Sequence, residues 1–357
     1  MLDLDVGPDG NLYVAQQFIP HVAVFSPAGE AIRAIGRAGG GPGEFDGWPV
    51  KLGWIGDTLW AYDHSATKLF GADGRESRRI QFSHRIGAEG SRFEAGAPLA
   101  DGSFLGRRVL SGDISKFYEA DSLSVPRFDA DGRLIEVIAR IAQPLRVPLQ
   151  DGSYASHPLA SWSGVSWVPT EVTKDGTALI LVRNIRSGAA ATFDLVKVGI
   201  DGHTQMARQI RYEPKPVSSS EQDWLRETFS GWVAGDYLER PSRFLSEATL
   251  ERRRRAAAAA IEFPPYHPPV RRIVAGEDGT IWVLRELELP DRVDRWEVYG
   301  PGGALEGSIR ITTGRSHGEP WAPHLNILWA DREQVWGTTV DELDVPYIHR
   351  FEIDRGC

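Results

Sequence analysis

Short runs rich in Val, Leu, Ile, Trp and Tyr alternate along the chain with turn residues, and one such arrangement recurs six times. Each time, a tight-turn signal comes first and a strand with large apolar residues follows it directly. The six turns are Asp9-Gly10, Gly56-Asp57, Asp101-Gly102, Asp175-Gly176, Asp278-Gly279 and the variant Asp331-Arg332-Glu333. Because Asp-Gly supplies the positive φ that tight hairpins need, each turn is predicted to join the first two strands of one blade. The pattern therefore predicts an all-β protein, a six-bladed β-propeller.

A second kind of turn follows a short strand that ends in an aromatic residue or Val. It occurs at FSPAGE (25–30), FGADGR (70–75), FDADGR (128–133), VGIDGH (198–203) and YGPGGA (299–304). These five turns are predicted to join third and fourth strands. A sixth should follow YIHRFEID, but the chain ends there, so the sixth blade is predicted to lack its own outer strand. Two explanations are open: a partner covers the exposed edge, or residues that once preceded Met1 supplied the strand.

We expect one propeller domain over 1–357, interrupted by a helical insertion between blades four and five. The predicted blades span approximately 1–37, 46–82, 95–140, 165–213, 270–312 and 324–354. In the insertion, 214–269, Ser218 to Ser220 offer an N-cap for a first helix, and Ser242 or Ser246 offers one for a second. A cluster of prolines from Pro264 onward is predicted to end the second helix.

With these residues in view, the chain resembles bacterial six-bladed propeller proteins related to NHL-repeat proteins, a group mostly of unassigned function. The matching stretches are GRAGGGPGEFDGWPV (36–50), FDADGRLIEVI, FPPYHPPVRRIVAGEDGTIWVL and DELDVPYIHRFEID. The resemblance covers nearly the whole chain, but its motifs are structural and specify the fold rather than a chemistry. Since members of such families are commonly exported, the resemblance implies an extracytoplasmic, periplasmic location.

Composition narrows the classes of function. A formal net charge of −9 argues against a nucleic-acid-binding protein, which would need a basic face to neutralise phosphates. The one cysteine, Cys357, is the last residue, so neither an internal disulfide nor a cysteine-based metal cluster can form. No apolar run reaches the length of a membrane span, and the first residues do not resemble a signal peptide. Peripheral association with a membrane stays open.

The glycine-rich run Gly39-Gly40-Gly41-Pro42-Gly43 lacks the Lys-Ser/Thr that a phosphate-binding loop requires. We therefore interpret it as the link between two blades, held by Glu44 and Phe45. No GxSxG motif occurs, and no Ser-His-Asp arrangement can be supported, so the sequence identifies no catalytic or cofactor-binding residues.

Weak candidates for a metal site are Asp341, Glu342 and Asp344 of the DELD segment, together with His64. Clustered carboxylates can bind a divalent cation such as Ca²⁺, although a solvated acidic loop is the simpler interpretation. The nine histidines show no zinc-site spacing. Asp63-His64, His267 and His324 fall in links that could reach a mouth of the channel, although ordinary hydrogen-bonded roles are expected for them.

The helical insertion offers candidates for binding a protein partner. These are Trp224, Trp232, Arg252, Arg253, Arg254 and Arg255. Four consecutive arginines point around most of a helix, so they cannot form one stripe, and Glu247 and Glu251 can pair with them. A solvated helix face is the simpler interpretation of this run. An acidic partner or an anionic membrane surface is the alternative.

Two classes of function are compatible with these observations. The first is a non-enzymatic binding or scaffolding propeller that presents a rigid surface to a protein partner, as an accessory subunit of an extracytoplasmic or membrane-associated complex. The second is a metal-dependent enzyme of the lactonase or lyase type that acts on a small substrate at the channel mouth. The insertion, the abundant Trp and the absence of a recognisable catalytic set favour the first. Binding of a small ligand without turnover is a third possibility.

Overall fold

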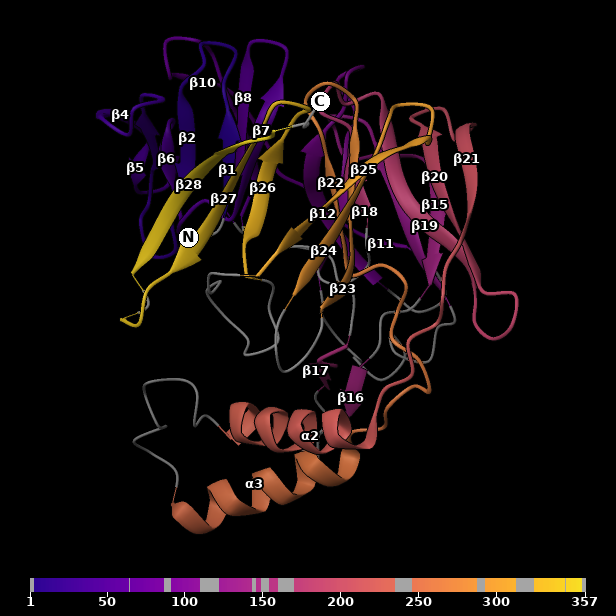
Figure 1. The fold of residues 1–357 in the computed structure, drawn as a ribbon. Helices are drawn as coiled ribbons and strands as arrows, with labels where there is room; N and C mark the ends of the chain where they lie inside the picture. Colours follow the sequence, from indigo (N-terminus) through magenta and orange to yellow (C-terminus); the bar gives the residue numbers. More distant parts are fainter. Residues whose placement is uncertain are drawn as a thin grey trace.

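Six small antiparallel sheets stand in a ring around a central axis, and two helices lie beyond one face of the ring (Figure 1). This is a six-bladed β-propeller, and the predicted fold class is confirmed. The computed structural model describes residues 3–63, 65–86, 91–109, 122–142, 146–148, 154–159, 170–234, 246–287, 293–312, 324–343 and 345–354.

Strands follow one another from the axis outward in each blade. Blade 1 contains β1 (Asp3–Val6), β2 (Leu12–Ala15), β3 (Val22–Phe25) and β4 (Ala31–Ile35). Blade 2 contains β7 (Lys51–Ile55), β8 (Thr58–Tyr62), β9 (Thr67–Phe70) and β10 (Glu76–Ile80). Blade 3 contains β11 (Ser83–Ile86), β12 (Ser91–Pro98), β13 (Phe104–Val109), β14 (Ser122–Phe128) and β15 (Leu134–Ala142).

The second half of the ring repeats this plan. Blade 4 contains β18 (Thr170–Val172), β19 (Ala178–Arg186), β20 (Thr192–Gly199) and β21 (Thr204–Arg211). Blade 5 contains β22 (Arg272–Ala275), β23 (Ile281–Leu287), β24 (Asp294–Tyr299) and β25 (Leu305–Ile311). Blade 6 contains β26 (Asn326–Ala330), β27 (Gln334–Val340) and β28 (Pro346–Glu352).

An aspartate stabilises the first hairpin of five blades by accepting a hydrogen bond from the backbone N–H two residues later. The five acceptors, at 2.7–3.2 Å, are Asp9, Asp101, Asp175, Asp278 and Asp331. Glycine follows four of them in the turn with φ of 67–80°. The local sequence alone thus specifies these turns, and the six predicted first hairpins are confirmed.

Blade 3 differs from the expected four strands, because β11 pairs with the first half of β12 from Ser83 opposite Glu94 to Ile86 opposite Ser91. The reason is the length of β12, which has eight residues where the inner strands of the other blades have three to five. Without β11, the first half of β12 would have an unpaired inner edge.

The sixth blade has three strands, as predicted, in the order β26-β27-β28. Seven residue pairs join β28 to β27, and none of the described strands pairs with the other edge of β28. The ring nevertheless closes on the inner side, because Leu12 and Val14 of blade 1 pack against Trp329 and Trp336 of blade 6. Side-chain packing between blades therefore joins the two ends of the chain.

The hydrophobic core is divided among the interfaces between blades. Between blades 1 and 2, for example, Val24 of β3 and Leu59 of β8 pack with Phe70 and with Phe45 of the connecting link. That link is the glycine-rich run, in which Gly41 N–H donates to Glu44 Oε2 at 2.8 Å and Gly39 N–H to Phe45 O at 3.0 Å. The short strands β5 (Arg37–Ala38) and β6 (Glu44–Phe45) pair here, so the predicted structural role of the run is confirmed.

The insertion forms two helices, α2 (Ser219–Ala234) and α3 (Glu247–Ala260), which pack on each other below the disc (Figure 1). Ser218 Oγ accepts a hydrogen bond from Glu221 N at 3.2 Å, and Ser246 is the N-cap of α3, as predicted. The core of the insertion also includes Val147 of the hairpin formed by β16 (Arg146–Pro148) and β17 (Tyr154–Ser156). None of the described helices is both long enough and apolar enough to span a membrane.

Candidate functional site

A cavity of about 280 Å³ lies at the axis of the propeller. The inner strands of all six blades contribute to its wall, through Asp3 of β1, Lys51 of β7, Ala97 of β12, Glu171 of β18, Arg272 of β22 and Leu328 of β26. The inner strands converge on the axis, so residues far apart in the sequence become neighbours here. Small-molecule sites are typically concave, partly apolar hollows with a few polar groups, as this cavity is.

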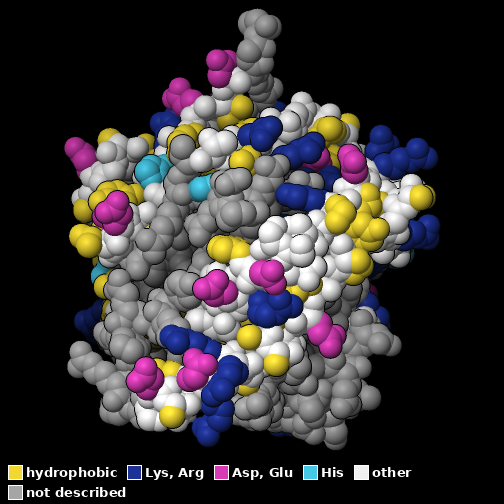
Figure 2. Space-filling view, turned by 60° about the horizontal axis from the view of Figure 1, so that its bottom comes forward, with side chains coloured by type: hydrophobic (Ala, Val, Ile, Leu, Met, Phe, Trp, Pro, Cys, Tyr) yellow, Lys and Arg dark blue, Asp and Glu magenta, His cyan; other side chains and the backbone are white. Residues whose placement is uncertain are grey.

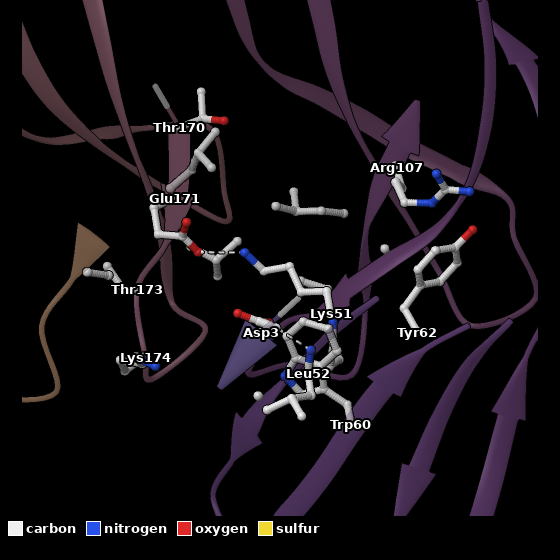
Figure 3. A pocket seen from close by; sticks show the side chains of 18 of the residues that line it. Asp3, Lys51, Leu52, Trp60, Tyr62, Arg107, Thr170, Glu171, Thr173 and Lys174 are labelled. Carbon is white, nitrogen blue, oxygen red and sulfur yellow. Dashed lines mark hydrogen bonds and ion pairs between the residues drawn. The ribbon is translucent and has the colours of Figure 1, made fainter. Parts of the chain in front are cut away.

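Four of these residues form a ring of alternating charge around the axis: Asp3, Lys51, Glu171 and Arg272. Lys51 Nζ lies 3.3 Å from Glu171 Oε1, an ion pair that joins blade 2 to blade 4 across the cavity (Figure 3). Asp3 Oδ2 accepts a hydrogen bond from Leu52 N–H at 2.9 Å. Buried charges are tolerated when partners of opposite sign are near, so the ring compensates much of its own desolvation.

The pKa values of these groups reflect a balance between burial and neighbouring charge. Burial raises the pKa of Asp3 to about 6, although Lys51 and the Leu52 N–H both oppose the shift. Burial lowers the pKa of Lys51, but Glu171 and Asp3 outweigh it, so the net shift is upward. Burial also lowers the pKa of Arg272 to about 10. Lys51 and Arg272 therefore stay cationic near neutral pH, whereas Asp3 is the group most easily neutralised.

A second polar network lies on the blade 3 side of the cavity, centred on Glu94 of β12. Arg107 Nη2 donates to Glu94 Oε2 at 2.6 Å, and Arg92 pairs with the other carboxylate oxygen. The Arg107 guanidinium lies 4.1 Å from the ring centroid of Tyr62, whose hydroxyl donates to Glu94 at 3.3 Å. Burial raises the pKa of Tyr62, so its phenol keeps its proton.

Sequence reasoning missed this cavity. A signal was present, since charged residues interrupt several otherwise apolar inner strands: LDLDV (2–6), VKLGWI (50–55) and VRRIVA (270–275). In LDLDV the charges Asp3 and Asp5 alternate with apolar residues, which is the pattern of a strand with one polar face. Sequence alone, however, does not show which charge faces which.

The edge of β28 with which none of the described strands pairs is the second feature that a ligand or partner could use. The third strands β20 and β24 are almost wholly buried, whereas every residue of β28 is exposed or half-exposed. Tyr347 and Phe351 are each 48% exposed. With His349 between them they form a row of rings whose centroids are 5.8–6.4 Å apart.

Of the predicted metal candidates, Asp341 and Glu342 lie at the turn between β27 and β28. Asp341 Oδ1 accepts hydrogen bonds from Leu343 N and Val345 N, both at 2.9 Å, so this carboxylate stabilises its own loop. Glu342 is exposed, while Asp344 and His64 lie outside the described residues. Across the part of the chain that the structure describes, no three His, Cys, Asp or Glu side chains are grouped closely enough to hold a metal ion.

Of the other histidines considered, His267 is buried and its Nε2 lies 3.0 Å from Glu221 Oε2 of α2. His324 is also buried, and its backbone N–H donates to Asp294 at 2.6 Å. The His267 side chain thus has an ordinary hydrogen-bonded role, as expected.

The partner-binding candidates of the insertion divide into two groups. Trp224 and Trp232 are half-buried and pack in the core of the two helices. Arg252 to Arg255 are exposed, and Arg254 and Arg255 approach Glu251 at 3.7 and 3.5 Å. Figure 2 turns this face toward the viewer and shows side chains of both charges interspersed over it.

No family model matches the chain. No curated protein matches it either. Among solved structures, a DUF4221 family member from Bacteroides vulgatus is 10% identical with a TM-score of 0.47, over 98% of this chain and 93% of that one. A putative exported protein from Bacteroides fragilis is 12% identical with a TM-score of 0.45, over 95% of this chain and 80% of that one. An inactive virginiamycin B lyase from Staphylococcus aureus, with quinupristin, is 10% identical with a TM-score of 0.38, over 97% and 82%.

These similarities are too low to carry an argument about function. The class of the protein, a six-bladed β-propeller, rests on its own sheets. The relation to NHL-repeat proteins stays a prediction.

Proposed function

We propose that this propeller is a non-enzymatic binding protein that takes an extended segment of a protein partner onto the free edge of β28. The observation that carries the proposal is the exposure of this third strand, whose counterparts β20 and β24 are buried. A strand edge offers a row of backbone donors and acceptors, and adding a strand to such an edge is a common mode of peptide recognition.

The side chains of β28 favour a partner segment with apolar residues at alternate positions. Tyr347 and Phe351 lie on one face of the strand, directly opposite Thr339 and Val335 of β27. Aromatic residues of this kind stabilise a neighbouring strand through cross-strand pairs worth about 0.2–1 kcal/mol each. Burying them would also remove exposed apolar surface from water.

The arginine run of α3 and the cellular location enter the proposal from the sequence. The exposed Arg252 to Arg255 stay candidates for an acidic partner or an anionic membrane surface. The extracytoplasmic location is part of the proposal through the sequence resemblance alone. For the alternative, a metal-dependent lactonase or lyase using Ca²⁺, no observation among the described residues adds support.

The test uses the double substitution Tyr347→Lys and Phe351→Lys, because lysines on an edge strand oppose pairing. Leu305→Lys is the matched control, since Leu305 is 60% exposed on β25, the outer strand of blade 5. We expect a photoreactive residue at position 347 to crosslink one partner from native extract, and the double variant to lose at least nine-tenths of its capture while Leu305→Lys keeps it.

Hydrogen exchange locates the contact independently. Every second backbone N–H of β28 points away from β27, and these outward-facing amides should exchange rapidly in the protein alone and become protected when the captured partner is added. Equal capture by the double variant would sink the proposal. Protection of the outward-facing β28 amides in the protein alone would also contradict the proposal, because the edge would then be occupied by a segment of the same chain.

A further inference from the structure

The central cavity extends away from the axis toward blade 3. Leu105 of β13, Val125 of β14 and Ile141 of β15 belong to its wall in addition to the inner strands. Trp60 of blade 2 and Leu179 of blade 4 border it on either side. The cavity therefore combines aliphatic side chains of blade 3, which lie beside Arg107 and Arg108 in the lining, with the ring of charges at the axis.

The charges that border the cavity are predominantly cationic. Its lining contains five basic side chains, Lys51, Arg107, Arg108, Lys174 and Arg272, against three acidic ones, Asp3, Asp5 and Glu171, which leaves +2. Glu94, buried beside Arg107 but outside the lining, also pairs with Arg92, so these two charges leave the sum at +2. An anionic group would thus complement the cavity better than a cationic one.

Lys51 is the cation best placed to receive such a group. Its ammonium has three N–H donors, and its one hydrogen bond to the residues that the structure describes is the 3.3 Å contact with Glu171. This distance exceeds the 2.7–2.9 Å typical of a strong charge-assisted bond. The side chains of Lys51 and Glu171 are 29% and 25% exposed, so both are accessible from the cavity.

We propose that the cavity binds a small apolar molecule that carries one carboxylate, with the carboxylate beside Lys51 and the apolar body against blade 3. The carboxylate accepts the remaining donors of Lys51. The aliphatic and aromatic wall around Trp60, Leu105 and Val125 removes the apolar body from water. The volume of about 280 Å³ lies near the lower end of small-molecule sites, so the ligand is compact. This site is separate from the β28 edge and does not depend on it.

The experiment titrates the purified protein with indole-3-acetate, benzoate and hexanoate, and with indole-3-acetamide as the uncharged counterpart of the first. Calorimetry gives the affinity, and the fluorescence of Trp60 and Trp54, which border the cavity, reports occupancy. We expect at least one carboxylate to bind, and its amide to bind at least tenfold more weakly because it lacks the charge that Lys51 recognises.

Two variants locate the site. Lys51→Met removes the ammonium but keeps an apolar stem, and Ala97→Leu fills the cavity without changing its charge; each should weaken binding at least tenfold. Lys215→Met, at a half-buried lysine outside the cavity, should bind as the wild type does. Circular dichroism checks that each variant is folded. Absence of binding by all three carboxylates at millimolar concentration overturns the proposal, as does unchanged affinity in both Lys51→Met and Ala97→Leu.

Discussion

Replacing Lys68 by methionine is expected to lower the free energy of unfolding by about 3–5 kcal/mol, because it leaves a buried carboxylate without its counter-charge. Lys68 of β9 and Asp63 are paired, and their side chains are 1% and 0% exposed. Asp63 also accepts hydrogen bonds from Asp46 N at 3.0 Å and Ala66 N at 3.1 Å. The carboxylate therefore cannot turn toward water without losing the hydrogen bond that holds the segment connecting blades 1 and 2. Urea unfolding followed by circular dichroism measures the loss.

The double variant Asp63→Asn with Lys68→Met tests the cause. It removes both charges while the Asn side-chain oxygen still accepts backbone hydrogen bonds, so we expect it to be more stable than Lys68→Met alone. Lys215→Met serves as the control and should change stability by less than about 0.5 kcal/mol, as is usual for substitutions outside buried networks. If Lys68→Met were as stable as this control, the pair would not contribute as described.

The second large effect is a loss of stability in the helical insertion as the pH falls. His157 is buried, and burial lowers its pKa to about 4. Its Nδ1 accepts a hydrogen bond from Leu159 N at 3.0 Å, so Nε2 must carry the proton that it donates to Glu262 O at 3.1 Å. Both ring nitrogens are thus satisfied in the neutral form, and a second proton would break the bond to Leu159.

The sign of the pH effect follows from linkage. Because the folded pKa of about 4 lies below the ordinary value of 6.5, His157 binds a proton more readily in the unfolded state between these two pH values. The contribution of neutral His157 is complete above pH 6.5 and is lost as the pH falls toward 4, which corresponds to about 3 kcal/mol. We expect the fluorescence of Trp224 and Trp232, which pack in the same core, to report this loss.

His157→Gln and His203→Gln form the matched pair for this experiment. His203 lies in a hairpin turn with its side chain 86% exposed. The variant at 157 should be less stable at pH 7 but should show a flatter dependence on pH between 6.5 and 4. The variant at 203 should follow the wild type. A wild-type pH profile retained by His157→Gln would show that other groups cause the acid effect.

The sequence by itself determined the blades. In Asp9-Gly10 and its Asp-Gly counterparts, the aspartate accepts a hydrogen bond from the backbone N–H two positions ahead. Such local geometry depends little on the rest of the fold. The three described strands of blade 6 were predictable from equally local signals, namely the turn at Asp331 and the strand segments on either side of it. The caps of α2 and α3, at Ser218 and Ser246, are equally local.

Only the tertiary structure decided which side chains meet. The Lys51–Glu171 pair joins positions 120 residues apart, and His157 reaches Glu262 across 105 residues. The closing of the ring around its axis brings the first pair together, and the packing of the insertion brings the second. The additional strand β11 likewise depends on the unpaired edge of β12, which exists only once blade 3 has formed. Turns are fixed by short-range hydrogen bonds and backbone sterics, whereas a cavity is defined by contacts between blades, and no single segment of the sequence contains those contacts.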